Sequence, residues 1–232
     1  MSFLLQLALV VVPAVLAITL HEVAHGYAAL ALGDDTAREQ GRLSLNPLRH
    51  VDQVGTFLVP GALILGQLLT IGRVSFMFGW AKPVPVSAWR FRDPRRGMML
   101  VAAAGPACNF VLAWGAAAAL HLTGALPGGG EDYADTALQM FILANLVLGL
   151  FNLLPIPPLD GGRILVGLLP EGLAARYARL EGAGILIVLL LVFVLPRLLA
   201  EFGVRFDPVG AALNSVIPWS FNLVYGLAGH GG

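Results

Sequence analysis

The stretch FLLQLALVVVPAVLAITLHEVAHGYAALALG (residues 3–33) determines how the rest of the chain is interpreted. It is apolar and longer than the about 20 residues that a membrane-spanning helix needs, yet it contains HEVAH at 21–25. In a helix, His21 and His25 lie one turn apart on the same face, so both imidazoles can bind one metal ion while Glu22 flanks it. The pattern favours Zn²⁺ with a neighbouring general base, placed inside a membrane helix.

The composition is that of an integral membrane protein. Hydrophobic residues make up 57% of the chain, charged residues 12%, and the mean hydropathy is +0.79. An ordinary soluble domain has about 25% charged residues. The formal net charge is zero, so no basic field points to nucleic acid as a partner. The only cysteine, Cys108, rules out an intramolecular disulfide and a thiolate zinc site.

Four apolar stretches are long enough to span a bilayer: 3–32, 97–124, 136–155 and 182–200. Two more, 54–78 and 208–228, are interrupted by proline, glycine or polar residues and are ambiguous. We therefore expect an all-α polytopic membrane protein, a bundle of about four to six transmembrane helices. No Lys or Arg precedes the first stretch, which indicates a retained helix rather than a cleaved signal peptide.

These boundaries predict one membrane-embedded domain over residues 1–205, with a catalytic core at about 3–165 that contains the HEVAH motif. An apolar C-terminal tail follows at 206–232. From the sequence, this tail is a further span, an interfacial helix or a disordered segment.

The distribution of Lys and Arg predicts the path of the chain through the membrane. Basic residues flank 54–78 on both sides and also follow the stretch 136–155, whereas the loop 125–135 is acidic. Because basic loops stay cytoplasmic, 54–78 is predicted to enter and leave from the same face as a re-entrant element. The path is then outside, in, re-entrant, out, in. The alternative makes 54–78 a true span and leaves one basic flank outside.

The stretch FGWAKPVPVSAW (78–89) predicts an extended or hairpin segment at the membrane interface, since Pro83 and Pro85 exclude a helix there. Such an extended edge could hold a substrate strand through main-chain hydrogen bonds. An aromatic-anchored loop explains the same pattern equally well.

Two histidines leave a catalytic zinc ion one protein ligand short. Asp160 is the candidate, because the other acids cluster in polar loops and at segment ends. It follows the prolines of FNLLPIPPLDGGRI (151–164), and the predicted topology gives it the same depth as His21 and His25. A carboxylate near hydrocarbon costs at least about 2.5–3.5 kcal/mol, which a divalent cation would offset. A helix cap or an ion pair with neighbouring Arg163 is the structural alternative.

Three further polar side chains lie in apolar surroundings. Glu22, beside a metal ligand, is positioned to deprotonate a bound water and to pass the proton to a leaving amine. Asn109 and Asn152 could donate hydrogen bonds to an oxyanion or to a substrate backbone. An interhelical hydrogen bond is the alternative role for both carboxamides.

The blocks HEVAH (21–25), AGPACN (104–109) and NLLPIPPLDGG (152–162) resemble the site-2 protease family of intramembrane zinc metalloproteases. The resemblance covers roughly residues 15–165 and is closest to the compact prokaryotic branch, without PDZ or CBS domains. It implies that His21, His25 and Asp160 bind one Zn²⁺, that Glu22 is the catalytic base, and that Asn152 is the active-site asparagine.

The resemblance also implies a protease that cuts membrane-protein substrates in or near their transmembrane helices, often in regulated intramembrane proteolysis. We expect a multi-pass protein of the plasma (inner) membrane, surrounded by lipid, with its active site toward the cytoplasm and with no nucleic-acid partner. Adaptor proteins and substrates are not named by the sequence. Two alternatives stay open at this point: a metal-ion or proton transporter, and a catalytically silent membrane scaffold.

Overall fold

The computed structural model describes residues 3–74, 79–127, 130–204 and 206–230, and within these ranges the chain contains helices and loops but no strand. The α-helices are α1 (Phe3–Ala31), α2 (Thr36–Glu39), α3 (Val59–Ile71), α4 (Pro94–Ala119), α5 (Gly130–Asn152), α6 (Asp160–Leu168), α7 (Glu171–Ala178), α8 (Gly184–Leu189), α9 (Leu195–Glu201) and α10 (Pro208–Leu227). Shorter 3₁₀ or π turns are η1 (Pro47–His50), η2 (Gln53–Leu58), η3 (Ala88–Arg90), η4 (Leu120–Ala125), η5 (Arg179–Ala183) and η6 (Leu190–Val194).

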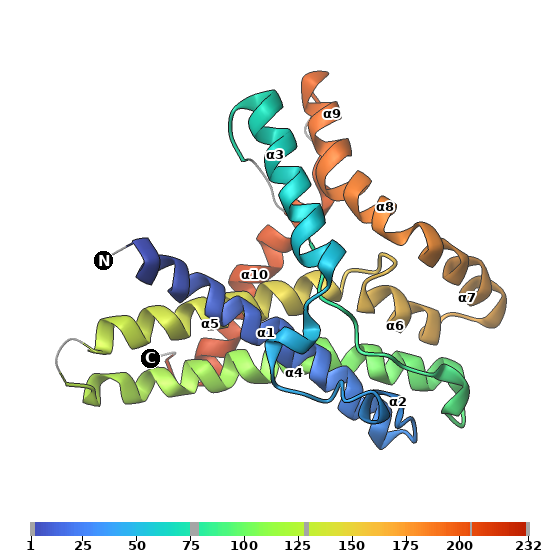
Figure 1. Ribbon diagram of the computed structural model, residues 1–232, viewed down its shortest axis with the longest axis horizontal. Helices are drawn as coiled ribbons and strands as arrows, with labels where there is room; N and C mark the ends of the chain where they lie inside the picture. The colour runs from blue at the N-terminus through green and yellow to red at the C-terminus, as the bar shows by residue number, and fades with distance from the viewer. Residues whose placement is uncertain (1–2, 75–78, 128–129, 205, 231–232) are drawn as a thin grey trace.

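Helices α1, α4 and α5 form the central bundle, with α10 packed against α4 and α5 (Figure 1). The contact between α4 and α5 uses small residues, Ala113, Ala116 and Ala117, against Ile142 and Leu146. Alanines let two helices approach closely, which favours packing in a membrane where there is no hydrophobic force between helices. The bundle brings the middle of α1 against the middle of α4, and this contact positions the site described below.

Two helical arms leave the bundle (Figure 1). One is α3, and the other runs from α7 through α8 to α9. Leucines on both arms, such as Leu69 and Leu186, are largely exposed, in keeping with surfaces that face lipid.

Five helical stretches in the described chain are long and apolar enough to cross a membrane: Phe3–Ala31, Gln53–Thr70, Pro94–Ala125, Gly130–Asn152 and Glu171–Glu201. The prediction of an all-α polytopic membrane protein is confirmed. The ambiguous segment 208–228 is helical as α10, although it is not apolar enough to be one of the five. The side chain of Val224 on α10 is buried in the core of the bundle.

The η2–α3 excursion starts and ends at one level of the fold. The N–H of Trp80 donates to the carbonyl of Gly55 at 3.1 Å, and the N–H of Lys82 donates to the carbonyl of His50 at 2.8 Å. The chain therefore leaves along α3 and returns to the place where η2 began, as a re-entrant element requires. Part of the predicted segment, residues 75–78, lies outside the described residues.

The segment 79–87 is extended, as predicted, but it forms no hairpin within the described residues, and a single 3₁₀ turn follows at Ala88–Arg90. Residue 78 of the predicted stretch lies outside the described part of the chain. The extended segment crosses beside α1, and its contacts there belong to the site.

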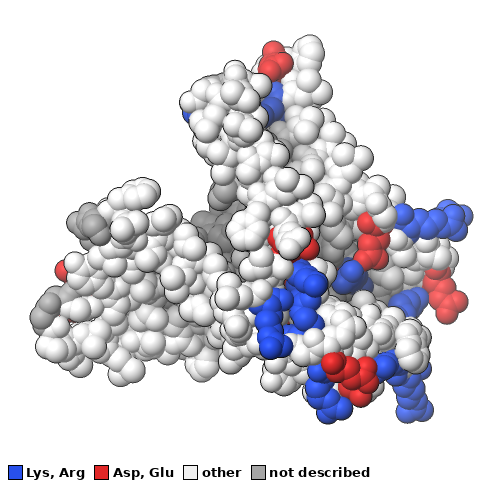
Figure 2. All heavy atoms as spheres, viewed as in Figure 1, with Lys and Arg blue, Asp and Glu red and all other residues white. Residues whose placement is uncertain are grey.

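Lys and Arg gather at one end of the bundle, around α2, α6 and α7, while the opposite end is almost free of them on this face (Figure 2). The basic end contains the C-terminus of α1 and the N-terminus of α4 (Figure 1). A basic end and an apolar body are typical of a protein that is oriented in a membrane by its positive charges.

The return of the chain to Gly55 predicts the relative topology of its flanks. Single cysteines at the exposed positions Gln53 and Lys82, in a Cys108→Ala background, are expected to react with an impermeant maleimide from the same side of the membrane. A cysteine at Arg176 should label from that side and one at Glu131 from the opposite side. Labelling of the first two positions from opposite sides would make 54–78 a true span.

Candidate active site

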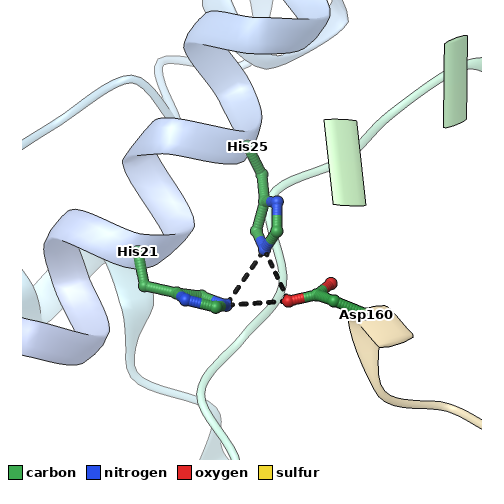
Figure 3. A group of neighbouring side chains, drawn as sticks. All are labelled: His21, His25 and Asp160. Atoms are coloured by element: carbon green, nitrogen blue, oxygen red, sulfur yellow. Dashed lines mark hydrogen bonds and ion pairs between the residues drawn. The ribbon is translucent and has the colours of Figure 1, made fainter. Parts of the chain in front are cut away.

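Three side chains from two distant parts of the chain converge beside α4. The Nε2 atoms of His21 and His25 lie 3.0 Å apart, and the Oδ2 atom of Asp160 lies 3.1 Å from the first and 3.3 Å from the second (Figure 3). Both histidines come from α1, and Asp160 is the first residue of α6. His21 and Asp160 are buried, and His25 is partly so.

The other ring nitrogen of each histidine is engaged. Nδ1 of His21 lies 2.6 Å from Oδ1 of Asn109, and Nδ1 of His25 lies 2.7 Å from the carbonyl oxygen of Val101. A carbonyl can only accept, so Nδ1 of His25 carries a proton. If Oδ1 of Asn109 accepts from His21 in the same way, both Nε2 atoms present lone pairs to Asp160.

A chain of amides fixes the direction of the hydrogen bond to His21. The carbonyl of Phe141 accepts from Nδ2 of Asn145 at 2.8 Å, which turns Oδ1 of Asn145 toward Asn109. That oxygen accepts from Nδ2 of Asn109 at 2.8 Å, which turns Oδ1 of Asn109 toward His21. Each link has one possible direction because it begins at a backbone carbonyl, so Nδ1 of His21 is the donor.

With both imidazoles neutral, three acceptors face one another in a buried place, and a cation between them would stabilise the arrangement. Oδ2 of Asp160 is buried and accepts no hydrogen bond within the described structure, which agrees with this conclusion. Ligands at 2.0–2.1 Å around a tetrahedral zinc ion are separated by about 3.3 Å, and the observed triangle of 3.0–3.3 Å has nearly that size. The residues present therefore fit a zinc ion with one position left open.

Gly105 of α4 makes room for the imidazoles. A Cβ atom on Gly105 would lie 2.5 Å from Nε2 of His25 and 2.6 Å from Cε1 of His21. Any side chain there would push the two rings out of the triangle. The glycine in AGPACN is therefore required by the close approach of α4 to the two histidines of α1.

The loop between α5 and α6 delivers Asp160. Helix α5 ends at Asn152, and prolines at 155, 157 and 158 prevent its continuation. A Cβ on Gly161 would collide with the carbonyl oxygens of Leu153 and Leu154, so only glycine allows α6 to start against the end of α5. The position of Asp160 at the N-terminus of a helix also stabilises its negative charge.

Glu22 is held by the extended segment. Its Oε2 atom accepts a hydrogen bond of 2.9 Å from the N–H of Val84, and Val84 itself is buried. One carboxylate oxygen is thereby fixed, and Oε1 is left to accept a proton. The backbone of segment 79–87 thus orients the side chain of the residue that follows His21.

The extended segment is in turn fixed on either side of Val84. The guanidinium of Arg42 donates to the carbonyls of Lys82 at 2.9 Å and Pro83 at 3.4 Å. The N–H of Ser87 donates to Oδ2 of Asp34 at 2.6 Å. Burial alone would raise the pKa of Asp34, but hydrogen bonds from Thr36 and Ser87 outweigh it and hold that pKa below its ordinary value. The carboxylate therefore stays ionised and keeps the segment in place.

The other predicted carboxamides take different positions. Asn109 is fully buried and bonded to His21 and Asn145, as described above. Asn152 is half-buried, and its Nδ2 atom donates to the carbonyl of Leu148 at 3.0 Å. In the described structure it makes no hydrogen bond to the three clustered side chains. Its predicted role toward substrate stays a prediction.

The sequence interpretation missed three contributors: Asn145, the carbonyl of Val101 and the N–H of Val84. Asn145 carries a signal, because a carboxamide in the apolar run FILANLVLGLF (141–151) needs a buried partner. The two backbone groups carry no sequence signal, since every residue has a carbonyl and every residue except proline has an N–H.

Comparison with known proteins points to a family of zinc metalloproteases. The family model for peptidase family M50 matches residues 131–195. YwhC of Bacillus subtilis (strain 168), a predicted zinc metalloprotease, is 43% identical over 192 residues, which is 80% of each chain. Rip2 of Mycolicibacterium smegmatis, also a predicted zinc metalloprotease, is 29% identical over 195 residues, or 83% of this chain and 70% of that protein.

Rip2 of Mycobacterium tuberculosis (strain H37Rv) is 34% identical over 182 residues, covering 77% of this chain and 64% of the relative. No solved structure matches the chain significantly. Zinc metalloprotease is the common description of these relatives, and it does not favour the transporter and scaffold that the sequence left open.

Gly105 and Gly115 offer a matched pair on α4. Gly105→Ala is expected to lower zinc occupancy markedly, because its Cβ would displace both imidazoles. Gly115 has open space around it, so Gly115→Ala should leave zinc unchanged and stabilise the helix by up to about 1 kcal/mol. Metal content of the purified proteins by mass spectrometry measures both. Equal zinc in the two variants would show that α4 does not confine the site.

Asn145→Leu is expected to weaken zinc binding by about tenfold, since Asn109 loses the partner that fixes its direction toward His21. Gln139→Leu, an exposed polar position on the same helix, is the matched control and should bind zinc like the wild type. Competition with a chelator gives both affinities. Identical values in the two variants would mean that the amide chain does not orient His21.

Proposed function

We propose a residue-by-residue mechanism for this chain, which belongs to peptidase family M50, the site-2 protease family, and is an intramembrane zinc metalloprotease. In this mechanism His21, His25 and Asp160 hold the zinc ion and Glu22 is the general base. The observation that carries the proposal is the convergence of the two Nε2 atoms and Oδ2 of Asp160 within 3.3 Å of one another. The carboxylate of Glu22, on the same apolar helix as the two histidines, is fixed by a hydrogen bond.

When bound, the zinc ion supplies a Lewis acid that lowers the pKa of a coordinated water toward about 7 and polarises a peptide carbonyl. The protein's part is to fix the geometry. Hydrogen bonds from both Nδ1 atoms hold the rings so that their Nε2 lone pairs point inward. Three protein ligands leave a fourth position for water or substrate.

Glu22 accepts the proton of the attacking water through the carboxylate oxygen that Val84 does not occupy. It then passes this proton to the nitrogen of the leaving amine. Because the N–H of Val84 fixes the other oxygen, the carboxylate needs no reorientation between the two transfers. This role makes the extended segment part of the catalytic arrangement.

The substrates are membrane proteins, and we propose that they are cut in or near a transmembrane helix. A helical carbonyl is bonded to the N–H four residues on, which makes it a poor target for water or metal, so the substrate helix must unwind locally. Asn152 is our candidate for holding the unwound backbone, with the N–H that Leu148 does not take.

We further propose that the site opens toward the cytoplasmic face of the plasma membrane. His21 lies ten residues before the end of α1 at Ala31, or about 15 Å along the axis, which is half of a 30 Å hydrocarbon core. That end of α1 belongs to the basic end of the bundle (Figure 2). The positive-inside rule supports the orientation.

Separate roles for metal ligands and base predict separate defects. Glu22→Gln should keep about one zinc per chain while cleavage of a transmembrane reporter falls at least about 100-fold, because general-base catalysis is lost. His21→Ala and Asp160→Ala should lose both zinc and cleavage, whereas Glu131→Gln and His121→Ala should lose neither. Mass spectrometry and a gel-based cleavage assay measure the two properties. Full zinc retention in folded Asp160→Ala would contradict the ligand assignment.

A further inference from the structure

A pocket of about 350 Å³ lies beside α1, one turn before the catalytic face. Its walls come from α1, from the segment 47–60 and from residues 79–81, with the base of α3 on one side (Figure 1). The lining is mainly apolar and includes Val15, Ile18 and Trp80. A preformed apolar pocket of this size can take one large aliphatic or aromatic side chain.

The register of α1 places the pocket under Glu22. Val15, Ile18 and Thr19 precede Glu22 by seven, four and three residues, so all four share one helix face. Side chains in a helix lean toward its N-terminus, which directs Glu22 over the turn that contains Ile18 and Thr19. Glu22 therefore lies on the same face of α1 as the pocket lining, one turn beyond it.

The extended segment also connects the two places. Ala81 lines the pocket, and Val84, three residues later, donates to Glu22 at 2.9 Å. Three residues of extended chain cover about 10 Å. A peptide held at Glu22 could therefore reach the pocket with a side chain one or two residues from the cut bond.

The pocket wall is fixed in advance. The N–H of Trp80 donates to Gly55, the hydroxyl of Thr56 donates to the carbonyl of Trp80 at 3.2 Å, and the Trp80 ring lies 2.5 Å from where a Cβ of Gly55 would stand. The wall that α1 contributes is partly accessible, because Val15 and Ile18 are 37% and 36% exposed. The pocket therefore has a preformed wall and an accessible surface.

We propose that this pocket is a specificity site that receives a large apolar side chain of the substrate next to the cut bond. The inference rests on the proposed function and adds the residues that select among transmembrane sequences. Transmembrane helices contain both large apolar residues, such as leucine and phenylalanine, and small ones, such as glycine and alanine, and only the large ones would fill the apolar pocket. The pocket would thereby set which position of an unwound helix lies at Glu22.

Zinc-binding hydroxamates test the proposal without a known substrate. The probes are succinyl hydroxamates that carry hydrogen, isobutyl or benzyl beside the zinc-binding group, measured by calorimetry on the zinc-loaded full chain in nanodiscs. The wild type is expected to bind the benzyl probe at least about tenfold more tightly than the unsubstituted one, because the pocket takes the added carbons. Ile18→Trp, which fills the pocket, should lose this ratio while its Kd for the unsubstituted probe stays unchanged.

Leu16→Trp is the matched control, since Leu16 is similarly exposed on α1 but does not line the pocket. It should keep the wild-type ratio. Ile18→Ala, which enlarges the pocket, should raise the preference for the benzyl over the isobutyl probe. If Ile18→Trp does not fold, this change in preference tests the role of the pocket.

An unchanged ratio in both Ile18 variants would overturn the proposal and leave the protease assignment standing. Failure of every hydroxamate to bind zinc-loaded wild type would contradict the proposed function itself and the pocket's role with it. A photoreactive lipid whose adducts on residues 79–81 persist under saturating benzyl probe would assign the pocket to an acyl chain and overturn its role in specificity.

Discussion

Three acceptor atoms facing one another in an apolar bundle are the constraint on which the structure depends. Two imidazole lone pairs and a carboxylate oxygen within 3.3 Å would repel one another without a cation, and burial removes the water that could separate them. The helices that supply them must therefore be held together by other contacts. The alanine contact between α4 and α5 and the packing of α1 on α4 provide that support.

Support of this kind requires direction as well as proximity. A histidine whose proton lies on the wrong nitrogen would present an N–H to the metal, and a free carboxamide can turn either way. Here both directions trace back to backbone carbonyls, Val101 for one ring and Phe141, through two asparagines, for the other. A backbone carbonyl can only accept a hydrogen bond. The backbones of α4 and α5 therefore determine that Nδ1 of each histidine carries a proton.

The sequence predicts much of this arrangement because the relevant signals are local. In a helix, the spacing of HEVAH places His21 and His25 on one face. The prolines and glycines around Asp160 indicate a turn that ends an apolar helix. Asn145 and the N–H of Val84 escape prediction for a different reason. Their partners, Asn109 and Glu22, lie 36 and 62 residues away, and no periodicity encodes which face of one helix meets which atom of another segment.

The extended segment shows how one backbone can serve two purposes. Prolines at 83 and 85 prevent this stretch from becoming a helix. Because the segment is not paired in a sheet, its N–H groups can bond to other partners. One of these groups, on Val84, fixes Glu22, while residues 79–81 form a wall of the apolar pocket. A substrate that displaced the segment would also release Glu22, the proposed base. Binding and catalysis are therefore compatible only if the peptide lies along the segment without moving it, which demands an unwound substrate backbone beside a wall that is already fixed.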